Sequence, residues 1–546
     1  MSRVRSWCLA LALAVAYLAG LGSYALTERS EARYVGVSYE MLQSSDYLTP
    51  RYNGIKHFHK PPLFYWANAA SMGILGQNEA AARLPCALSA LATLALVAWW
   101  AKQPQAGCPR PWLAPAVLGT APFFWQMGRV AITDMPLTLL VTGALAAAWQ
   151  ILSCGPTTKR LLLFWLSLGL GFLDKGPVAP LLVALVLLPL VVWGKARWRS
   201  LIHVPGIALA ALISLPWYLW AVAANPGLLD YFLRYQTLDR LVTTVHQRPG
   251  PPWFYLPVLL AGFLPWSPWL LLALARAARA AKAARTTNAT HPAQAPPEPS
   301  FDLFLVSWLV VPTAFFSCIG SKLPPYVLPM FPAMALLVAR HLGRPTFRQM
   351  LAPLAVLLVI ATACAGQARD HWFPRLDLFG HELCSAALWL SLLLVASALL
   401  HLQLEPVDLV AVPVVGMLGL VAIALPALPK LDRNTCRPLV ETIQARASGP
   451  YRVAMHGGYL FGLPYYLGSP ITHVDYPRET RFETDPTSKD LMIPSLPDYF
   501  SQLSQSKKDE FFIVPLPMLT AISRRLDAPV IYRDDRWGVV HQRARR

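Results

Sequence analysis

Charged side chains, acidic, basic or both, occur in six short motifs that border long apolar runs. The motifs are SEARY (30–34), FHKPP (58–62), GRVAITDMP (128–136), DKGP (174–177), HQR (246–248) and SKLPPY (321–326). Lysine binds a phosphate as a point charge, and arginine binds it through two parallel hydrogen bonds. A carboxylate accepts a proton from an attacking group or binds a positively charged substituent. Cations and carboxylates in this combination indicate chemistry on a phosphorylated substrate.

These motifs are positioned by apolar segments that are long enough to cross a membrane. Of the 546 residues, 55% are hydrophobic and 14% are charged, whereas an ordinary soluble protein has about 25% charged residues. The mean hydropathy of +0.42 excludes a disordered or collagen-like chain. A spanning helix needs about 20 mostly apolar residues, and about thirteen segments qualify. They lie at about 6–26, 84–101, 111–127, 135–153, 161–173, 177–194, 201–222, 253–275, 302–319, 325–339, 350–366, 383–402 and 409–427.

The distribution of lysine and arginine predicts the orientation of these segments. Basic residues are denser in the loops that share a side with the N-terminus, which include KARWR (195–199) and RAARAAKAAR (276–285). Because cytoplasmic loops carry such an excess, the N-terminus is predicted to be cytoplasmic. All six motifs then lie at the outer ends of helices, where polar groups indicate chemistry at the membrane surface. The net charge of +18 does not predict nucleic acid binding, because the basic residues form no aromatic-interleaved patch.

The sequence predicts a polytopic α-helical membrane protein with a small C-terminal α/β domain outside the membrane. Residues 1–429 form the transmembrane domain, which includes a periplasmic first loop (27–83) and a flexible cytoplasmic linker (276–300) rich in alanine, arginine and then proline. The first loop is too long for a plain connector and predicts short amphipathic helices along the membrane surface. Residues 430–546 contain short β-like runs such as FFIVP (511–515) and form the periplasmic domain.

Four of the motifs carry a family resemblance. An acidic-x-Arg-Tyr motif directly after the first apolar segment, the KPP segment (60–62), TDMP (133–136) and SKLPPYVLP (321–329) resemble the glycosyltransferases of the protein O-mannosyltransferase superfamily. Within it, the chain is similar to the bacterial lipid A aminoarabinose transferases, strongly over about 25–340 and by architecture elsewhere. The resemblance implies the GT-C fold, with about thirteen membrane helices and a periplasmic C-terminal domain.

The resemblance also implies an activity in the bacterial inner membrane. A sugar, 4-amino-4-deoxy-L-arabinose, is transferred from undecaprenyl phosphate to a phosphate of lipid A on the periplasmic face, with inversion at the anomeric carbon. Carried over by position, the catalytic residues are Glu31, Lys60 and Asp134. The residues implied to bind substrate are Arg33, Tyr34, His59, Arg234, His246, Arg248, Lys322 and Tyr326. Replacing Lys60 or Glu31 by alanine is expected to abolish transfer without unfolding the protein.

The chain departs from the family pattern at two positions. The first-loop motif of the family usually begins Asp-Glu, and Ser30 stands at the first place here; the residue before the KPP lysine is commonly Glu, and here it is His59. These departures leave open whether a divalent metal ion is bound as a cofactor, with Glu31, His59 and His246 as the candidate ligands. A phosphate acceptor tolerates the loss of the Asp, because its second pKa near 6 makes it an anion already, whereas a hydroxyl acceptor needs a base.

Three alternatives remain open from the sequence. One is a related transferase that moves a polyprenyl-linked sugar onto another glycan or a protein. Another is a lipid-phosphate transporter, which would show inverted repeats and helices broken at mid-membrane. The third is a structural or binding protein of the envelope, which needs no combination of acids and cations. Motifs at the membrane surface favour the transferases, acting with membrane lipids and without nucleic acid.

Overall fold

The computed structural model describes residues 3–192, 198–238, 250–290, 300–342, 434–475 and 491–544. The chain divides into two compact units. The helical unit comprises Met1–Ala19, Cys86–Arg129 and Thr133–Pro426. The loop–sheet unit comprises Gly20–Pro85, Val130–Ile132 and Ala427–Arg546. The first loop thus belongs with the C-terminal residues, whereas the sequence placed it in the transmembrane domain.

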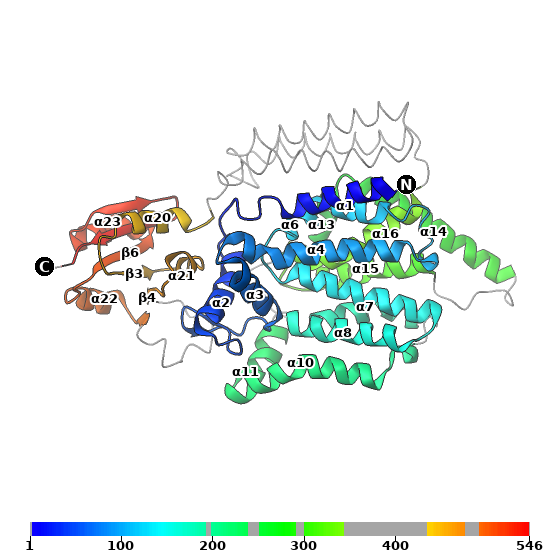
Figure 1. Cartoon of the computed structure of the whole chain (residues 1–546), viewed down its shortest axis with the longest axis horizontal. Helices are drawn as coiled ribbons and strands as arrows, with labels where there is room; N and C mark the ends of the chain where they lie inside the picture. Colours follow the sequence, from blue (N-terminus) through cyan, green and yellow to red (C-terminus); the bar gives the residue numbers. More distant parts are fainter. Residues whose placement is uncertain are drawn as a thin grey trace, which may run out of the picture. The chain divides into compact units, whose positions relative to one another are not determined.

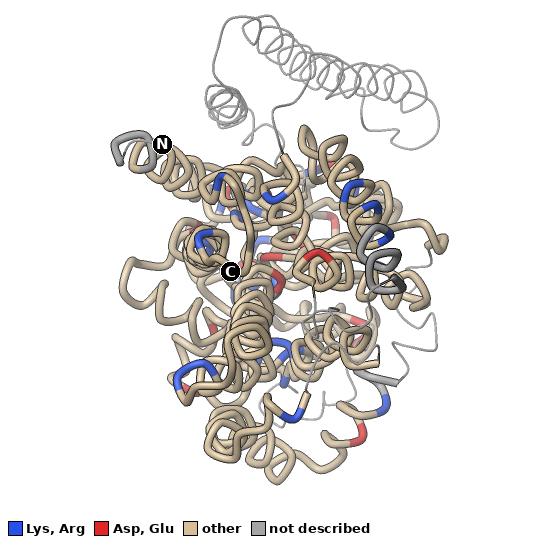
Figure 2. Tube along the Cα trace, turned by 90° about the vertical axis from the view of Figure 1, so that its right-hand side faces the viewer, with Lys and Arg blue, Asp and Glu red and all other residues tan. Residues whose placement is uncertain are grey.

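The helical unit is built from apolar helices that pack side by side (Figure 1). Long runs without a charged residue separate short charged stretches of the chain (Figure 2). The helix α4 begins in the loop–sheet unit and belongs to the helical unit from Cys86 onward. The main helices are α1 (Arg3–Leu18), α4 (Glu79–Ala101), α7 (Asp134–Cys154), α8 (Thr158–Lys175), α9 (Val178–Val192), α10 (Val204–Ala224), α15 (Phe301–Cys318) and α16 (Phe331–His341).

Four of the described helices, α4, α7, α10 and α15, are long and apolar enough to cross a membrane. The pair α13 (Tyr255–Gly262) and α14 (Ser267–Thr290) adds a fifth if it forms one bent span. The prediction of a multi-pass helical membrane protein is therefore confirmed. The apolar window of α7 is 67% buried and that of α10 only 17%, so α7 lies inside the unit. The spans predicted at 350–366, 383–402 and 409–427 lie outside the described residues, and the number thirteen stays a prediction.

Prolines divide two segments that the hydropathy pattern predicts as continuous. The segment 253–275 bends by 110° between α13 and α14, and Pro265 and Pro268 lie at the break. Proline has no N–H and its ring clashes with the preceding turn, so a helix does not run straight through such a pair. The segment 111–127 is likewise split into α5 (Leu113–Gly119) and α6, which begins with its proline (Pro122–Met127).

The linker predicted at 276–300 is wrong for most of its length, because α14 continues to Thr290. Residues 276–285 are only alanine, arginine and lysine, and these residue types have high intrinsic helix propensity. The alanine- and arginine-rich composition that suggested a flexible linker therefore favours a helix. Residues 291–299 of the predicted linker lie outside the described part of the chain.

The loop–sheet unit contains a six-stranded mixed sheet, which confirms the predicted C-terminal α/β fold. The strand order is β5-β4-β3-β6-β8-β7, with β5, β4, β3 and β6 parallel and both pairings of β8 antiparallel. The strands are β3 (Tyr451–His456), β4 (Thr472–Val474), β5 (Met492–Ile493), β6 (Asp509–Pro515), β7 (Val530–Arg533) and β8 (Trp537–Gln542). The helices are α20 (Arg437–Arg446), α21 (Leu463–Leu467), α22 (Leu496–Leu503) and α23 (Leu516–Leu526).

The central strand β6 is apolar on both faces. Phe511 and Ile513 pack in one core with residues of α20, and Phe512 and Val514 pack in another with residues of α22 and α23. Successive side chains of a strand point to opposite faces, and strands covered on both faces are continuously apolar. This burial explains the FFIVP run.

The first loop folds into the two short helices that the sequence predicts and a hairpin between them. The helices are α2 (Glu31–Ser44) and α3 (Leu63–Leu75), and the hairpin joins β1 (Arg51–Tyr52) to β2 (Ile55–Lys56). Asn53 and Gly54 at its turn both have positive φ, as a two-residue type I′ turn requires. The Asn53 amide accepts from the backbone N–H of Ile471 and donates to its carbonyl, each at 2.9 Å. The hydroxyl of Tyr52 donates to the carbonyl of Phe461 at 2.8 Å.

A buried carboxyl group lies where the chain before α2 meets the residues around α20. The backbone N–H of Glu28 donates to the carbonyl of Asn434 at 2.8 Å, and Oε1 of Glu28 accepts from the N–H of Gly462 at 2.9 Å. The residue is 3% exposed. Burial raises the pKa of Glu28 from 4.5 to about 7, although hydrogen bonds and the charge of Arg536 oppose the shift.

The raised pKa of Glu28 predicts a pH-dependent stability. The folded protein binds this proton more tightly than the unfolded chain, so stability falls as pH rises from 4.5 to about 7. The loss amounts to about 3 kcal/mol. Glu28→Gln should therefore flatten the decrease of the thermal unfolding midpoint between pH 5 and pH 8, and the exposed Glu441→Gln serves as a control. Equal pH dependence in both variants would contradict the assignment.

Candidate active site

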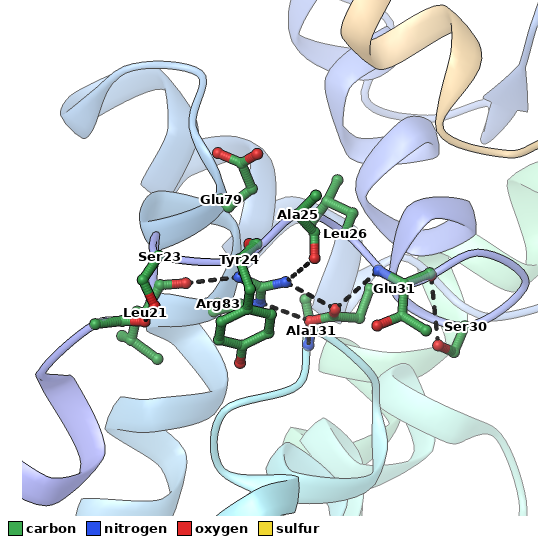
Figure 3. Close-up of polar contacts among 12 residues, drawn as sticks. Leu21, Ser23, Tyr24, Ala25, Leu26, Ser30, Glu31, Glu79, Arg83 and Ala131 are labelled. Atoms are coloured by element: carbon green, nitrogen blue, oxygen red, sulfur yellow. Dashed lines mark hydrogen bonds and ion pairs between the residues drawn. The ribbon is translucent and has the colours of Figure 1, made fainter. Parts of the chain in front are cut away.

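The first residue of α2, Glu31, forms a buried ion pair with Arg83 of α4 (Figure 3). Arg83 Nε lies 2.8 Å from Oε1 and Nη2 lies 2.9 Å from Oε2, and both side chains are 0% exposed. The backbone N–H groups of Thr27 and Ala131 donate to Oε2 at 3.1 Å and to Oε1 at 2.9 Å. Burial alone would raise the pKa of Glu31, but Arg83 and these hydrogen bonds lower it below its usual value. The carboxylate is therefore ionised.

The remaining donors of Arg83 bind the chain between α1 and α2. Nη1 donates to the carbonyls of Leu21 at 2.6 Å and Tyr24 at 2.8 Å, and Nη2 donates to that of Ala25 at 2.7 Å. The guanidinium carbon also lies 3.6 Å from the ring centroid of Tyr24, within cation–π distance. Arg83 was not among the predicted site residues, because the sequence shows it only at the edge of an apolar segment.

Arg33 and Tyr34 follow Glu31 in the first turn of α2. Tyr34 is buried against the rings of Phe64 and Tyr65 in α3, with centroids 5.8 and 6.0 Å away. The guanidinium carbon of Arg33 lies 5.6 Å from the ring centroids of both Tyr34 and Phe461. Arg33 is half-buried, so its charge is held beside aromatic rings and keeps access to solvent.

His57, His59 and Lys60 lie between the hairpin and α3. The rings of the two histidines are 4.0 Å apart. Burial and the charge of Arg33 lower the pKa of His57 to about 3, so its imidazole is neutral at physiological pH. His59 and Lys60 are half-buried. Two prolines separate Lys60 from the start of α3, and their fixed φ restricts the direction of the chain there.

A second cluster lies within the helical unit, at the ends of α7 and α8. Lys175 Nζ at the end of α8 lies 2.6 Å from Oδ1 of Asp134 at the start of α7, with side chains 8% and 10% exposed. The same Nζ lies 5.7 Å from the ring centroid of Tyr326, in the 3₁₀ helix η5 (Pro324–Met330). Lys322, which is 8% exposed, donates through Nζ to the carbonyl of Ile319 at 2.6 Å. The structure thus brings together a carboxylate, a lysine and a tyrosine.

Lys175 is a candidate site residue that the sequence did not assign. In the DKGP motif Lys175 follows Asp174, and in the structure Lys175 pairs with Asp134, 41 residues earlier. DKGP lies at the predicted outer end of its helix, as the other motifs do. This shared position is the sequence signal that could have identified Lys175 as a site residue. Asp134 also starts α7, where the helix dipole favours a carboxylate.

The remaining predicted residues are Arg234, His246 and Arg248. Arg234 is exposed in the π-helix η3 (Tyr231–Leu238). His246 and Arg248 fall in the segment 239–249, which lies outside the described residues. Among the residues that the structure does describe, no group of three or more His, Cys, Asp or Glu is arranged to hold a metal ion. Of the candidate ligands, Glu31 is engaged by Arg83, and a divalent metal ion stays a prediction.

Part of the chain matches a known protein family. Residues 59–220 match the family of dolichyl-phosphate-mannose-protein mannosyltransferases. An undecaprenyl phosphate-alpha-4-amino-4-deoxy-L-arabinose arabinosyl transferase of Pseudomonas fluorescens is 33% identical over 444 residues, which cover 78% of this chain and 76% of that protein. The chain belongs to the family of these arabinosyl transferases.

Further relatives agree with this membership, and a solved structure shows the fold. The arabinosyl transferase of Edwardsiella ictaluri is 31% identical over 353 residues, 63% of this chain, and that of Pseudomonas aeruginosa is 35% identical over 350 residues. The matched region spans only 61% and 60% of the length of these two relatives. ArnT from Cupriavidus metallidurans, solved with undecaprenyl phosphate bound, has a TM-score of 0.84 at 23% identity and covers 99% of this chain and 98% of its own. The chain therefore has the GT-C membrane fold of this family, as the motifs implied.

Proposed function

We propose that this protein is a membrane glycosyltransferase that moves 4-amino-4-deoxy-L-arabinose from undecaprenyl phosphate to a phosphate of lipid A. The reaction would take place on the periplasmic face of the bacterial inner membrane. The observation that carries the proposal is the 33% identity to an arabinosyl transferase over 78% of the chain. The buried acids and cations of the two clusters agree with such a reaction.

The cations would serve the leaving group. Undecaprenyl phosphate departs with growing negative charge, and preorganised positive charges at that oxygen often supply the largest part of catalysis. Lys60 and Arg33, which lie in the same unit, are the candidates among the described residues, and Lys322 stays a prediction from the SKLPPY motif. Arg33 can contact a phosphate with two parallel hydrogen bonds, whereas the two lysines act as point charges.

The carboxylate of Asp134 would bind the sugar, whose 4-amino group is positively charged. Lys175 fixes one carboxylate oxygen at 2.6 Å, which restricts the orientation of the other. The attacking phosphate of lipid A is already an anion at neutral pH and needs no proton acceptor. Because no proton acceptor is needed, the reaction is compatible with Ser30 at the position where the family usually has Asp. A single displacement would invert the anomeric carbon.

A related transferase with a hydroxyl acceptor on a glycan or protein is the second candidate, favoured by the match of residues 59–220 to the mannosyltransferase family. Such an acceptor must lose a proton and needs a base. Nothing in the described part of the chain favours transport: the bent pair α13 and α14 is explained by its prolines.

Lipid A analysis tests the proposed function. Lipid A from a strain that lacks its own aminoarabinose transferase should gain the mass of one aminoarabinose when this chain is expressed, together with a decrease in polymyxin susceptibility. Purified protein in lipid nanodiscs, supplied with the undecaprenyl-linked sugar and lipid A, should give the same product. Unmodified lipid A alongside a newly glycosylated protein or glycan would favour the second candidate instead.

A further inference from the structure

The hydrogen-bonding capacity of Glu31 is fully used inside the protein. An ionised carboxylate offers about four lone-pair sites on its two oxygens. Oε1 accepts from Arg83 Nε and from the N–H of Ala131, and Oε2 accepts from Arg83 Nη2 and from the N–H of Thr27. The four sites are occupied by four donors, and the side chain has no exposed surface. The carboxylate therefore has no site left to bind a substrate or to accept a proton during the reaction.

Arg83 is equally saturated. A guanidinium has five N–H donors. Nε and one N–H of Nη2 bind Glu31, and the other three bind the carbonyls of Leu21, Tyr24 and Ala25 (Figure 3). The ring of Tyr24 lies against the guanidinium carbon. The pair is therefore a closed network with no donor left to bind a phosphate.

The network fixes a segment that has no regular structure of its own. Residues between the end of α1 at Leu18 and the start of α2 at Glu31 belong to no helix or strand, so their buried carbonyls need donors from elsewhere. Arg83 supplies these donors. Ser30, at the N-cap of α2, makes no side-chain cap, and Glu31 accepts from Thr27 instead. A carboxylate in this first turn also interacts favourably with the helix dipole.

The direction of Arg33 depends on this arrangement, because Arg33 lies in the same first turn of α2 two residues after Glu31. The contact of Glu31 with Ala131 also ties the first turn to the stretch 130–132 that precedes the TDMP motif. A shift of the pair would move these chain segments together.

We propose that Glu31 and Arg83 are positioning residues for sugar transfer, and that Glu31 is not its proton acceptor. The pair holds the first turn of α2 so that Arg33 meets the donor phosphate, an inference that rests on the proposed function. The two charged groups bind each other and backbone groups of the protein. Removal of one leaves the other buried and unpaired, whereas removal of both does not.

Single and double variants in lipid nanodiscs test the proposal. Glu31→Gln and Arg83→Lys should each raise the KM for the undecaprenyl-linked sugar about 10- to 100-fold, because a misplacement of about 1 Å costs that much. The shape of the pH profile of kcat should not change. The double variant Glu31→Gln/Arg83→Met should regain part of the lost affinity, because it leaves no buried charge unpaired although the carbonyls of Leu21, Tyr24 and Ala25 still lose their donors. Glu79→Gln, one turn before Arg83 on α4, is the matched control and should behave as the wild type.

Two results would overturn the positioning role. One is a large loss of kcat in Glu31→Gln at unchanged KM, with the acidic limb of the pH profile gone, which would identify Glu31 as the base. The other is wild-type KM in Arg83→Lys and Arg83→Met. Binding of undecaprenyl phosphate alone separates this proposal from the proposed function: it should weaken in both single variants and recover in part in the double variant even if the protein transfers a different sugar.

Discussion

Substitution of Lys60 by alanine is expected to lower the rate of sugar transfer by about 10²- to 10³-fold, the usual effect of removing one group that stabilises charge in a transition state. Lys60 is half-buried and lies just before the two prolines that lead into α3. A side chain in such a loop contributes little to folding, and its loss should change stability by less than about 0.5 kcal/mol. Transfer should therefore fall while the protein stays folded.

Lys56 provides the matched control for Lys60. It lies four residues earlier in strand β2, is also half-buried, and stands opposite Arg51 in the hairpin. Lys56→Ala should retain nearly full transfer in the same nanodisc assay, with thermal unfolding measured on both variants. Full activity of Lys60→Ala, or an equal loss in the two variants, would remove Lys60 from the proposed mechanism.

The ion pair of Lys175 with Asp134 carries the second large prediction. Lys175→Met leaves the Asp134 carboxylate buried and unpaired, and breaking a buried pair in this way costs about 3–5 kcal/mol. The double variant Asp134→Asn/Lys175→Met should recover most of this stability, because the carboxylate of Asp134 is then removed together with its partner. It should not recover transfer, because Asp134 is proposed to bind the amino group of the sugar.

Thermal unfolding and transfer, measured on the two single variants and the double variant, form a double-mutant cycle for this pair. The expected outcome differs from that for Glu31 and Arg83, where the double variant regains part of its affinity for the donor substrate. Transfer by Asp134→Asn/Lys175→Met at the wild-type rate would show that this pair, too, only stabilises the fold.

The structure changes the expectation for Glu31 in particular. From the sequence, Glu31→Ala abolishes transfer and leaves the fold intact. The buried guanidinium of Arg83 would lose its only carboxylate partner among the described contacts, so the alanine variant should also lose stability. Loss of transfer in that variant would therefore not identify a catalytic base.

Hydropathy and motif order are sufficient to predict much of this fold. The spans α4, α7, α10 and α15 follow from long apolar runs, and β6 follows from FFIVP, because burial on one or both faces leaves a local pattern. The ends of α13, α5 and α6 are less predictable from hydropathy, since prolines interrupt a segment whose apolar character continues.

The partners of charged residues are the part that the sequence cannot supply. Arg83 and Glu31 are 52 residues apart, and Lys175 and Asp134 are 41 apart. No local spacing relates such pairs, because they meet only when separate helices pack. The motifs identify Glu31 and Asp134 as unusual acids, but whether a carboxylate faces a substrate or an arginine depends on tertiary structure.

The hairpin tip limits how this protein can be shortened. A chain cut at residue 430 would keep all six motifs, yet Asn53 would lose both hydrogen bonds to Ile471 and Tyr52 its acceptor at Phe461. His57, His59 and Lys60 follow the hairpin directly in the sequence. A shortened enzyme must therefore keep the C-terminal domain, because its backbone groups hold the hairpin of the first loop in place.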